Sequence, residues 1–185
     1  MKTYSVELRL WHWLHAITVL GLLGTFFLRK TFLSWRANSE ILMLKLAEFD
    51  ITVTTEQAKV LAKTIRAPMW EWHIILGFIF ATLLLWRLVM IMKNGFDYNT
   101  EDSHMKWVYR GYRVIYAILS FMAFSGLVMY FYQDIGLSKE IAKNIKELHE
   151  LIAWSVVAFV FMHIVGVFVA DNSNQKGIIS KMISG

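Results

Sequence analysis

Four stretches of the sequence are each apolar over about the thickness of a bilayer, and this feature constrains the fold most strongly. A helix that crosses a membrane needs roughly 20 consecutive, mostly apolar residues. The stretches occupy residues 10–28, 72–92, 114–133 and 150–170. Arg87 is the one charged residue inside the second stretch. The pattern predicts an all-α membrane protein, a four-transmembrane-helix bundle that forms a single domain over residues 1–185.

The composition supports a membrane location. Hydrophobic residues make up 57% of the chain and charged residues 18%, whereas soluble domains carry about 25% charged residues. The net charge of +5 does not indicate nucleic acid, because the basic residues flank the apolar stretches as membrane-edge charges do. There is no cysteine, which excludes disulfides, iron–sulfur ligation and thioether attachment of haem. We expect membrane lipid as a partner and no nucleic acid.

The long first connection, residues 29–71, contains a candidate amphipathic helix. Thr54 and Gln57 fit a capping box, and Pro68 marks the end of the pattern. The predicted helix covers residues 54–66 and carries its apolar side chains on one face. These side chains are Val60, Leu61 and Ile65. Such a helix is expected to lie on the membrane surface or over the mouth of the bundle.

Five of the six histidines lie at or inside the predicted membrane helices. They are His12, His15, His73, His149 and His163. Ionisable groups in a membrane are costly and usually face the bundle interior with a partner. A single histidine of this kind is as often structural as functional. The spacing between the five histidines is therefore needed to distinguish the two roles. The sixth, His104, is expected to be a solvated loop residue.

Two of the predicted helices carry polar side chains at the same interval. His149 and His163 are 14 residues apart, so they project to nearly the same side of a helix and are separated by about 21 Å along its axis. His73 and Arg87 have the same spacing on a helix that runs in the same direction. Each helix therefore offers a polar group at two depths of the membrane.

The first helix runs the opposite way and brings its histidines to the depth of His163. The arrangement predicts two opposed pairs, His73 with His149, and His12 or His15 with His163. Facing imidazoles on a helical bundle indicate b-type haems, because each haem iron takes two axial ligands from facing helices. A metal or proton transporter is an alternative, since intramembrane histidines also mark transport paths. That alternative predicts a single clustered site near mid-membrane.

His12 and His15 are three residues apart and point about 60° apart on a helix, so both cannot bind one iron from the same face without strain. Arg87 is expected either to contact a haem propionate or to reach the lipid headgroups, and Arg9 is a second candidate for a cofactor contact. Small residues near the ligands could make room for a flat macrocycle or simply allow close helix packing. They are Gly21, Gly24, Gly77, Ser125, Gly126 and Gly166.

The sequence resembles the bacterial di-haem cytochromes b561, which include the b-type cytochrome subunits of membrane-bound nickel–iron hydrogenases and related periplasmic oxidoreductases. The stretches that carry the resemblance are "RLWHWLHA", "HIILGFIFATLLLWRL", "GLVMYFY", "LHELIAWSVVAFVFMHIVG" and the tail "GIISKMISG". The amphipathic stretch of the first connection lies outside these motifs. The family places its first ligand at the histidine just before tryptophan, which here is His12.

The resemblance implies a ligand set and an orientation. His73 and His149 would hold a haem on the periplasmic side, and His12 and His163 a haem on the cytoplasmic side. The chain would be a multi-pass protein of the bacterial cytoplasmic membrane with both termini in the cytoplasm. His15 would then be a neighbour that contacts a propionate, lines a proton path or, as we favour, satisfies a hydrogen bond.

The expected function is electron transfer between the quinone pool and a periplasmic redox partner, with quinone as donor or acceptor. The partner would be a hydrogenase, another dehydrogenase or reductase, or a cytochrome c. The resemblance also suggests an enzyme, a superoxide:quinone oxidoreductase that acts without a partner subunit. Lysines on the periplasmic face could attract the superoxide anion, but acidic residues are interleaved with the lysines of the third connection. These lysines are Lys139, Lys143 and Lys146.

Overall fold

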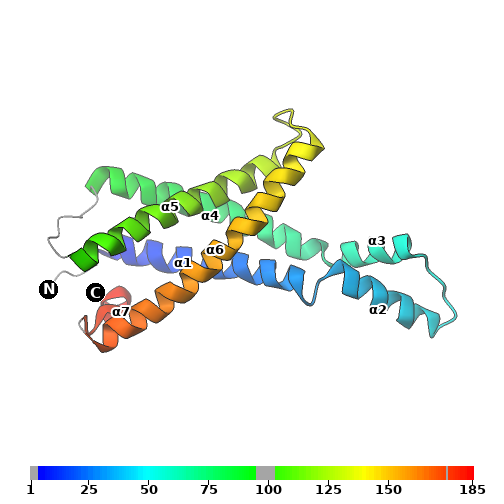
Figure 1. The fold of residues 1–185 in the computed structure, drawn as a ribbon, viewed down its shortest axis with the longest axis horizontal. Helices are drawn as coiled ribbons and strands as arrows, with labels where there is room; N and C mark the ends of the chain where they lie inside the picture. Colours follow the sequence, from blue (N-terminus) through cyan, green and yellow to red (C-terminus); the bar gives the residue numbers. More distant parts are fainter. Residues whose placement is uncertain (1–3, 95–102, 174) are drawn as a thin grey trace. The chain divides into compact units, whose positions relative to one another are not determined.

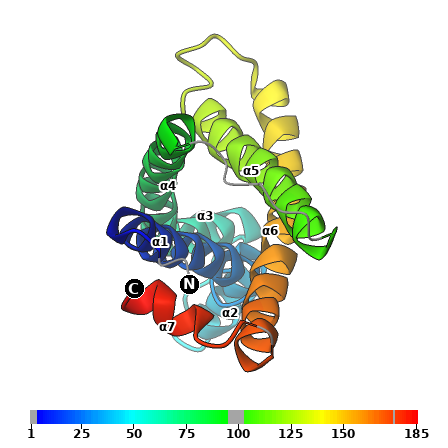
Figure 2. The ribbon, with the colours of Figure 1, turned by 90° about the vertical axis from the view of Figure 1, so that its left-hand side faces the viewer.

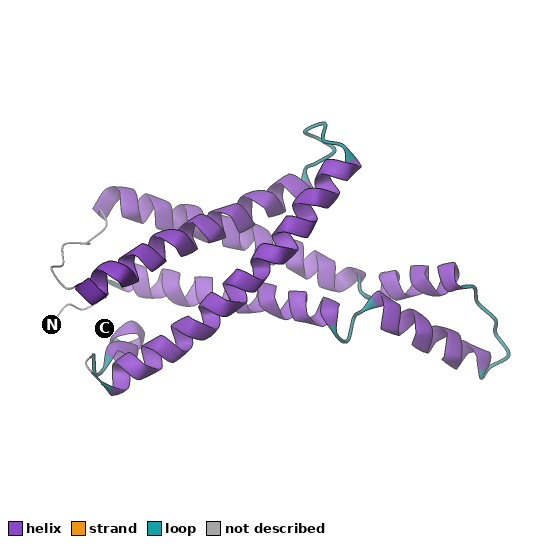
Figure 3. Ribbon diagram, viewed as in Figure 1, coloured by secondary structure: helices purple, strands orange, loops and turns teal. Residues whose placement is uncertain are grey.

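The computed structural model describes residues 4–94, 103–173 and 175–185, and within these ranges the regular structure is helical and contains no strand (Figures 1 and 3). The helices are α1 (Val6–Lys30), α2 (Trp35–Ala47), α3 (Thr55–Ile65), α4 (Ala67–Asn94), α5 (Ser103–Tyr130), α6 (Lys139–Asn172) and α7 (Ile178–Ile183). Acidic Glu7 in the first turn of α1 and basic Arg29 and Lys30 in its last turn match the helix dipole.

Helices α1, α4, α5 and α6 are each long and apolar enough to cross a membrane, which confirms the four predicted spans. Their ends differ from the prediction, because an apolar run marks the hydrocarbon thickness while the helix continues into the polar interface. Helix α5 begins at Ser103 and α6 at Lys139. The expectation that His104 lies in a loop is therefore wrong, since this residue belongs to the first turn of α5.

The first connection folds as a hairpin of two helices, α2 and α3, which pack against each other (Figure 1). The predicted helix over residues 54–66 is confirmed as α3. Its capping box is complete: the Thr54 hydroxyl accepts from the Gln57 amide at 3.2 Å, and the Gln57 side chain accepts from the Thr54 amide at 2.8 Å. Helix α2 was not predicted.

The face that α3 buries is not the one that its apolar residues suggest. Ala58 and Ala62 are fully buried, because small side chains let two helices approach closely, whereas Val60, Leu61 and Ile65 are exposed. An exposed apolar face is what a helix at a membrane surface presents. Its location at the membrane surface or over the bundle mouth stays a prediction.

The chain divides into two compact units, Ile17–Gly77 and a larger unit of Met1–Ala16 with Phe78–Gly185. The predicted single domain over residues 1–185 stays a prediction.

In the larger unit, the first turns of α1 pack on α4. Trp11, Leu83 and Met90 form a buried cluster. The Trp11 indole donates to the carbonyl of Leu83 at 2.7 Å, and the Trp86 indole donates to the Glu7 carboxylate at 3.0 Å. These directional bonds, together with the buried cluster, hold the first turns of α1 in a defined register on α4.

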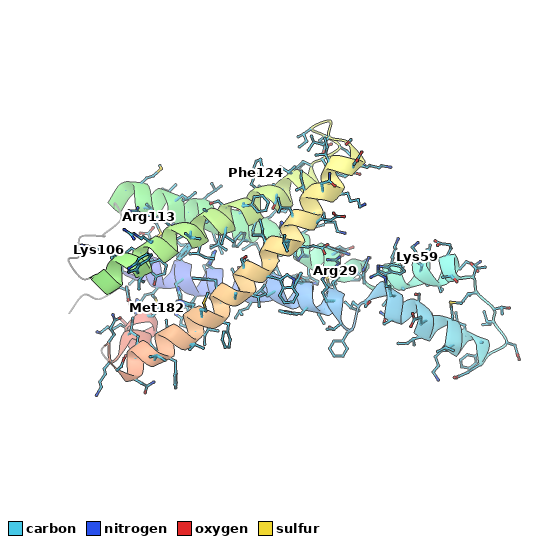
Figure 4. All side chains as sticks on the ribbon, in the orientation of Figure 1. Arg29, Lys59, Lys106, Arg113, Phe124 and Met182 are labelled. Atoms are coloured by element: carbon cyan, nitrogen blue, oxygen red, sulfur yellow. The ribbon has the colours of Figure 1, made fainter. Side chains whose placement is uncertain are left out.

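The short helix α7 packs beside the same turns of α1 (Figure 2). Arg9 donates to the carbonyl of Ile183 at 3.2 Å, and Trp13 donates to that of Met182, labelled in Figure 4, at 3.1 Å. The last carbonyls of a helix have no partner within the helix. Side chains of α1 therefore cap the C-terminus of α7.

Replacing Trp11 by Phe should destabilise the protein, because it removes a buried hydrogen bond from the contact of α1 with α4. We expect a loss of about 1–3 kcal/mol in the free energy of unfolding, measured by thermal or denaturant unfolding in detergent. Trp13→Phe is the matched control, since its indole bond is exposed, and it should cost less than about 0.5 kcal/mol. Equal losses for the two variants would contradict this account of the core.

Candidate functional site

The larger unit brings the imidazole rings of His12 of α1 and His163 of α6 close together. Their ring centroids are 6.1 Å apart and the ring planes are inclined by 56°. Two imidazoles bound to one metal, with metal–nitrogen bonds of about 2 Å on either side, have ring centroids about 6 Å apart. The separation therefore fits one metal between the two rings.

Aromatic neighbours hold both rings. Phe159, one turn before His163 on α6, stacks on it with centroids 5.7 Å apart and planes at 18°. Trp13 meets His12 edge-to-face at 5.4 Å. Such contacts fix the direction in which an imidazole points.

In the unit Ile17–Gly77, His73 of α4 contacts a hydroxyl on α1. Its Nδ1 lies 2.7 Å from the Thr25 hydroxyl oxygen. Trp70, three residues earlier on α4, packs edge-to-face against the His73 ring at 5.5 Å. Because Nδ1 is engaged, Nε2 is the nitrogen that would bind a metal.

In the larger unit, His149 of α6 makes the same kind of contact with α5. Its Nδ1 lies 2.7 Å from the Ser125 hydroxyl oxygen. Helices α5 and α6 pack against each other, and the Ser138 side chain caps the start of α6 by accepting from the amide of Ile141 at 3.2 Å. The adjacent Gly126 lies beside the His149 ring, where a Cβ would stand 3.8 Å from Cε1, an ordinary van der Waals distance.

The other glycines that were predicted to make room divide into two groups. Gly21 belongs to close helix packing, because a Cβ there would meet the side chain of Leu76 at 2.9 Å. A Cβ on Gly24, Gly77 or Gly166 would meet no described atom within 4 Å. Space beside these three positions is compatible with a flat macrocycle, and that role stays a prediction.

His15 has surroundings of a different kind from those of His12. Its ring stacks on Trp11 with centroids 4.8 Å apart and lies 5.2 Å from the ring of Phe80. Its Nε2 is buried and has no hydrogen-bond partner among the described residues, so the favoured structural hydrogen bond is not found at this nitrogen. Of the two histidines, His12 is the one whose ring faces His163.

The two candidate arginines are both anchored inside the larger unit. Arg87 donates through Nε to the Tyr116 hydroxyl at 2.9 Å, and its guanidinium lies 5.3 Å from the centre of the Trp11 ring. Arg9 caps α7, and its Nε is buried without a hydrogen-bond partner in the described part of the chain. Contacts of either arginine with a cofactor stay predictions.

The partners Thr25 and Tyr116 were not foreseen from the sequence, and Ser125 was noted only for its small size. A hydroxyl in an apolar run gives a weak signal, because it usually bonds a carbonyl of its own helix. The contact with a histidine of another helix appears only when the helices are packed.

Comparison with known families identifies the kind of protein that carries these histidines. Residues 3–185 match the family model described as prokaryotic cytochrome b561. The chain belongs to this family. No curated protein and no solved structure matches the chain. The family makes this chain a multi-pass bacterial membrane protein, a b-type cytochrome that binds b-type haem and acts in electron transfer, as the resemblance predicted.

The donor set of the cytochrome suits haem. The histidines occur singly on different helices or far apart on one helix, apart from the His12 and His15 doublet. Among the described residues, no group of three or more His, Cys, Asp or Glu side chains is placed to hold a metal ion. Two facing imidazoles and four ring nitrogens of a macrocycle complete the coordination of iron without any further protein ligand.

The environments of His12 and His15 predict different effects of substitution. His12→Ala should lower the haem-to-protein ratio by about half, because it removes an imidazole that faces His163, and His15→Ala should leave the ratio unchanged. The ratio is measured from the haem absorbance of the purified protein. Loss of a haem in His15→Ala but not in His12→Ala would show that His15 is the ligand.

Proposed function

We propose that the cytochrome holds two b-type haems and passes electrons across the membrane between the quinone pool and a periplasmic redox partner. His12 and His163 would hold one haem, and His73 and His149 the other. The observation that carries the proposal is the 6.1 Å separation of the facing His12 and His163 rings. Iron with two imidazole ligands has no open position for oxygen or substrate, so it serves electron transfer.

The haem would supply one-electron redox chemistry, and the chain would position the haem and tune its potential. His149 and His163 lie on one continuous helix, α6, about 21 Å apart along its axis. The two ligand levels are thus separated by most of the hydrocarbon thickness, which is about 30 Å. That separation supports transfer from one side of the membrane to the other.

Arg87 is the proposed partner of a haem propionate. The Tyr116 hydroxyl and the Trp11 ring fix its guanidinium, and its remaining N–H groups are suited to a carboxylate. Such a contact would orient the macrocycle in the site.

The hairpin of α2 and α3 is the proposed docking surface for the periplasmic partner, with the termini of the chain in the cytoplasm. Its large apolar side chains are exposed, with Leu44 at 69% and Phe49 at 73%. Exposed apolar patches of this kind mark sites of protein or membrane contact. A hydrogenase, another oxidoreductase or a cytochrome c is the partner class that the proposal implies.

Cations gather on the same unit. Figure 4 shows Arg29 at the end of α1 and Lys59 on α3. Burial and the nearby charge of Arg29 lower the pKa of the Arg66 guanidinium, which nevertheless stays charged at neutral pH. Lys59 pairs with Glu56 at 3.2 Å, so Arg29 and Arg66 are the cations that would favour a partner with an acidic face.

The structure adds no support for the two alternative functions. At the start of α6, Lys143 pairs with Glu147 at 3.8 Å and Lys146 with Glu150 at 3.4 Å. These lysines therefore form ion pairs and do not present a bare positive patch that would steer superoxide. The transporter alternative requires a clustered site, and the described residues contain none of three or more ligands.

The proposal is tested on purified protein by visible spectra and haem quantification. We expect two haems per chain, with reduced-minus-oxidised bands typical of b-type haem. His149→Ala and His163→Ala should each remove one haem, because each histidine serves a different iron. Absence of haem bands would refute the proposal, and loss of both haems in either variant would refute the separation into two sites.

The direction of electron flow and the class of redox partner are tested in separate experiments. A quinol should reduce the oxidised haems of the purified cytochrome. Rapid reduction by superoxide without any other subunit would favour the superoxide:quinone oxidoreductase. If quinol reduces the haems and superoxide does not, a function with a partner subunit is supported.

A further inference from the structure

Two buried hydroxyls make the same contact with the imidazoles of His73 and His149. Thr25 of α1 is 8% exposed and Ser125 of α5 is 2% exposed. In each case the hydroxyl oxygen lies 2.7 Å from Nδ1 of the histidine. The pairs occur in different units and on different helices, so each was formed by its own local packing.

The second contact of each hydroxyl determines where the hydrogens lie. The Thr25 hydroxyl is 2.7 Å from the Leu22 carbonyl oxygen, and the Ser125 hydroxyl is 2.7 Å from the Phe121 carbonyl oxygen. A carbonyl only accepts, so the single hydroxyl hydrogen is donated to it. The hydroxyl oxygen must then accept from Nδ1–H of the histidine. The hydrogen-bond network therefore assigns both rings the tautomer with hydrogen on Nδ1 and a lone pair on Nε2.

This arrangement has a chemical consequence for a metal bound at Nε2. An imidazole that donates its other N–H to an acceptor is fixed in orientation and becomes a more basic ligand. A more basic ligand stabilises ferric over ferrous iron, and hydrogen bonding around the ligands is one of the means by which a protein sets a haem potential. The two hydroxyls are thus expected to lower the midpoint potential.

The other pair of histidines differs. Within the described ranges, the structure gives the rings of His12 and His163 no hydrogen-bond partner, and their neighbours Trp13 and Phe159 are aromatic. The two predicted haems would therefore have chemically distinct surroundings at their axial ligands.

We propose that Thr25 and Ser125 are positioning residues that fix His73 and His149 for ligation through Nε2 and lower the midpoint potential of the haem that these histidines hold. The proposal rests on the proposed function for the identity of the bound group. The roles of the two hydroxyls are additional to that function, because electron transfer as proposed above does not require them.

The test is a redox titration of the purified full-length cytochrome, followed through the visible bands of its haems. Thr25→Val and Ser125→Ala should each raise one midpoint potential. At fixed ambient potential, we expect the reduced-to-oxidised ratio of that haem to rise about threefold, or about 28 mV at 59 mV per tenfold for one electron. Thr25→Ser and Ser125→Thr keep the hydroxyl and should retain the wild-type value.

Control hydroxyls lie on α4, which carries His73, and on α5, which carries Ser125. Thr82→Val removes a hydroxyl of α4 that donates to the carbonyl of Phe78 at 2.9 Å, and Ser120→Ala removes one from α5. Neither should move a haem potential. If Thr25→Val or Ser125→Ala loses one haem while its hydroxyl-retaining variant keeps both, the positioning role is supported.

The outcomes separate this proposal from the proposed function. Unchanged potentials in both Thr25→Val and Ser125→Ala, or an equal shift in Thr25→Ser and Thr25→Val, would overturn the role of the hydroxyls. Shifts in two different haems would preserve that role and overturn the pairing of His73 with His149. A wild-type protein without haem would overturn the proposed function itself.

Discussion

An imidazole inside a bilayer needs a partner, because hydrocarbon offers no hydrogen bond and desolvation of an unpaired polar group is costly. In the described part of the chain, the packing of the membrane helices meets this constraint with a hydrogen bond for His73 and His149. In the same part of the chain, His12 and His163 have only ring contacts, and the Nε2 of His15 is left without a hydrogen-bond partner. His73 and His149 bond hydroxyls of neighbouring helices. His12 faces His163 across a gap that one metal would fill. His15 is stacked on Trp11 and lies against Phe80.

The third of these contacts links the site to the stability of the larger unit. The Trp11 ring stacks on His15, and the guanidinium of Arg87 lies 5.3 Å from the centre of the same residue's ring. The Trp11 indole N–H donates to the Leu83 carbonyl. One residue thus ties the turns of α1 that carry His12 to the part of α4 that carries Arg87. Packing of the two helices and positioning of the candidate ligands depend on the same side chain.

Features that rest on local physics could be predicted from the sequence. The four spans follow from hydrocarbon thickness, and α3 follows from the Thr54 and Gln57 capping box. Helix α2 was missed because its apolar residues form a continuous run, "ILML", and not a periodic stripe. The short α7 was missed because its carbonyls are capped by Arg9 and Trp13, which are distant in sequence.

In the candidate site, too, features set within one helix could be predicted and features set by packing between helices could not. The interval between His149 and His163 is a property of one helix and was evident from the sequence. Which of His12 and His15 faces His163 depends on how α1 packs, so the helical spacing alone could not settle it. The contacts of Thr25 with His73 and of Ser125 with His149 also depend on packing between helices, and no local sequence pattern predicts them.

The central claim is that each haem iron takes two imidazoles and has no open position. Addition of carbon monoxide to the reduced, purified cytochrome tests this claim most directly, because carbon monoxide binds ferrous haem only where a position is open. We predict that the visible spectrum of both haems remains unchanged. A spectrum that shifts to that of a carbon monoxide complex would contradict ligation by two histidines.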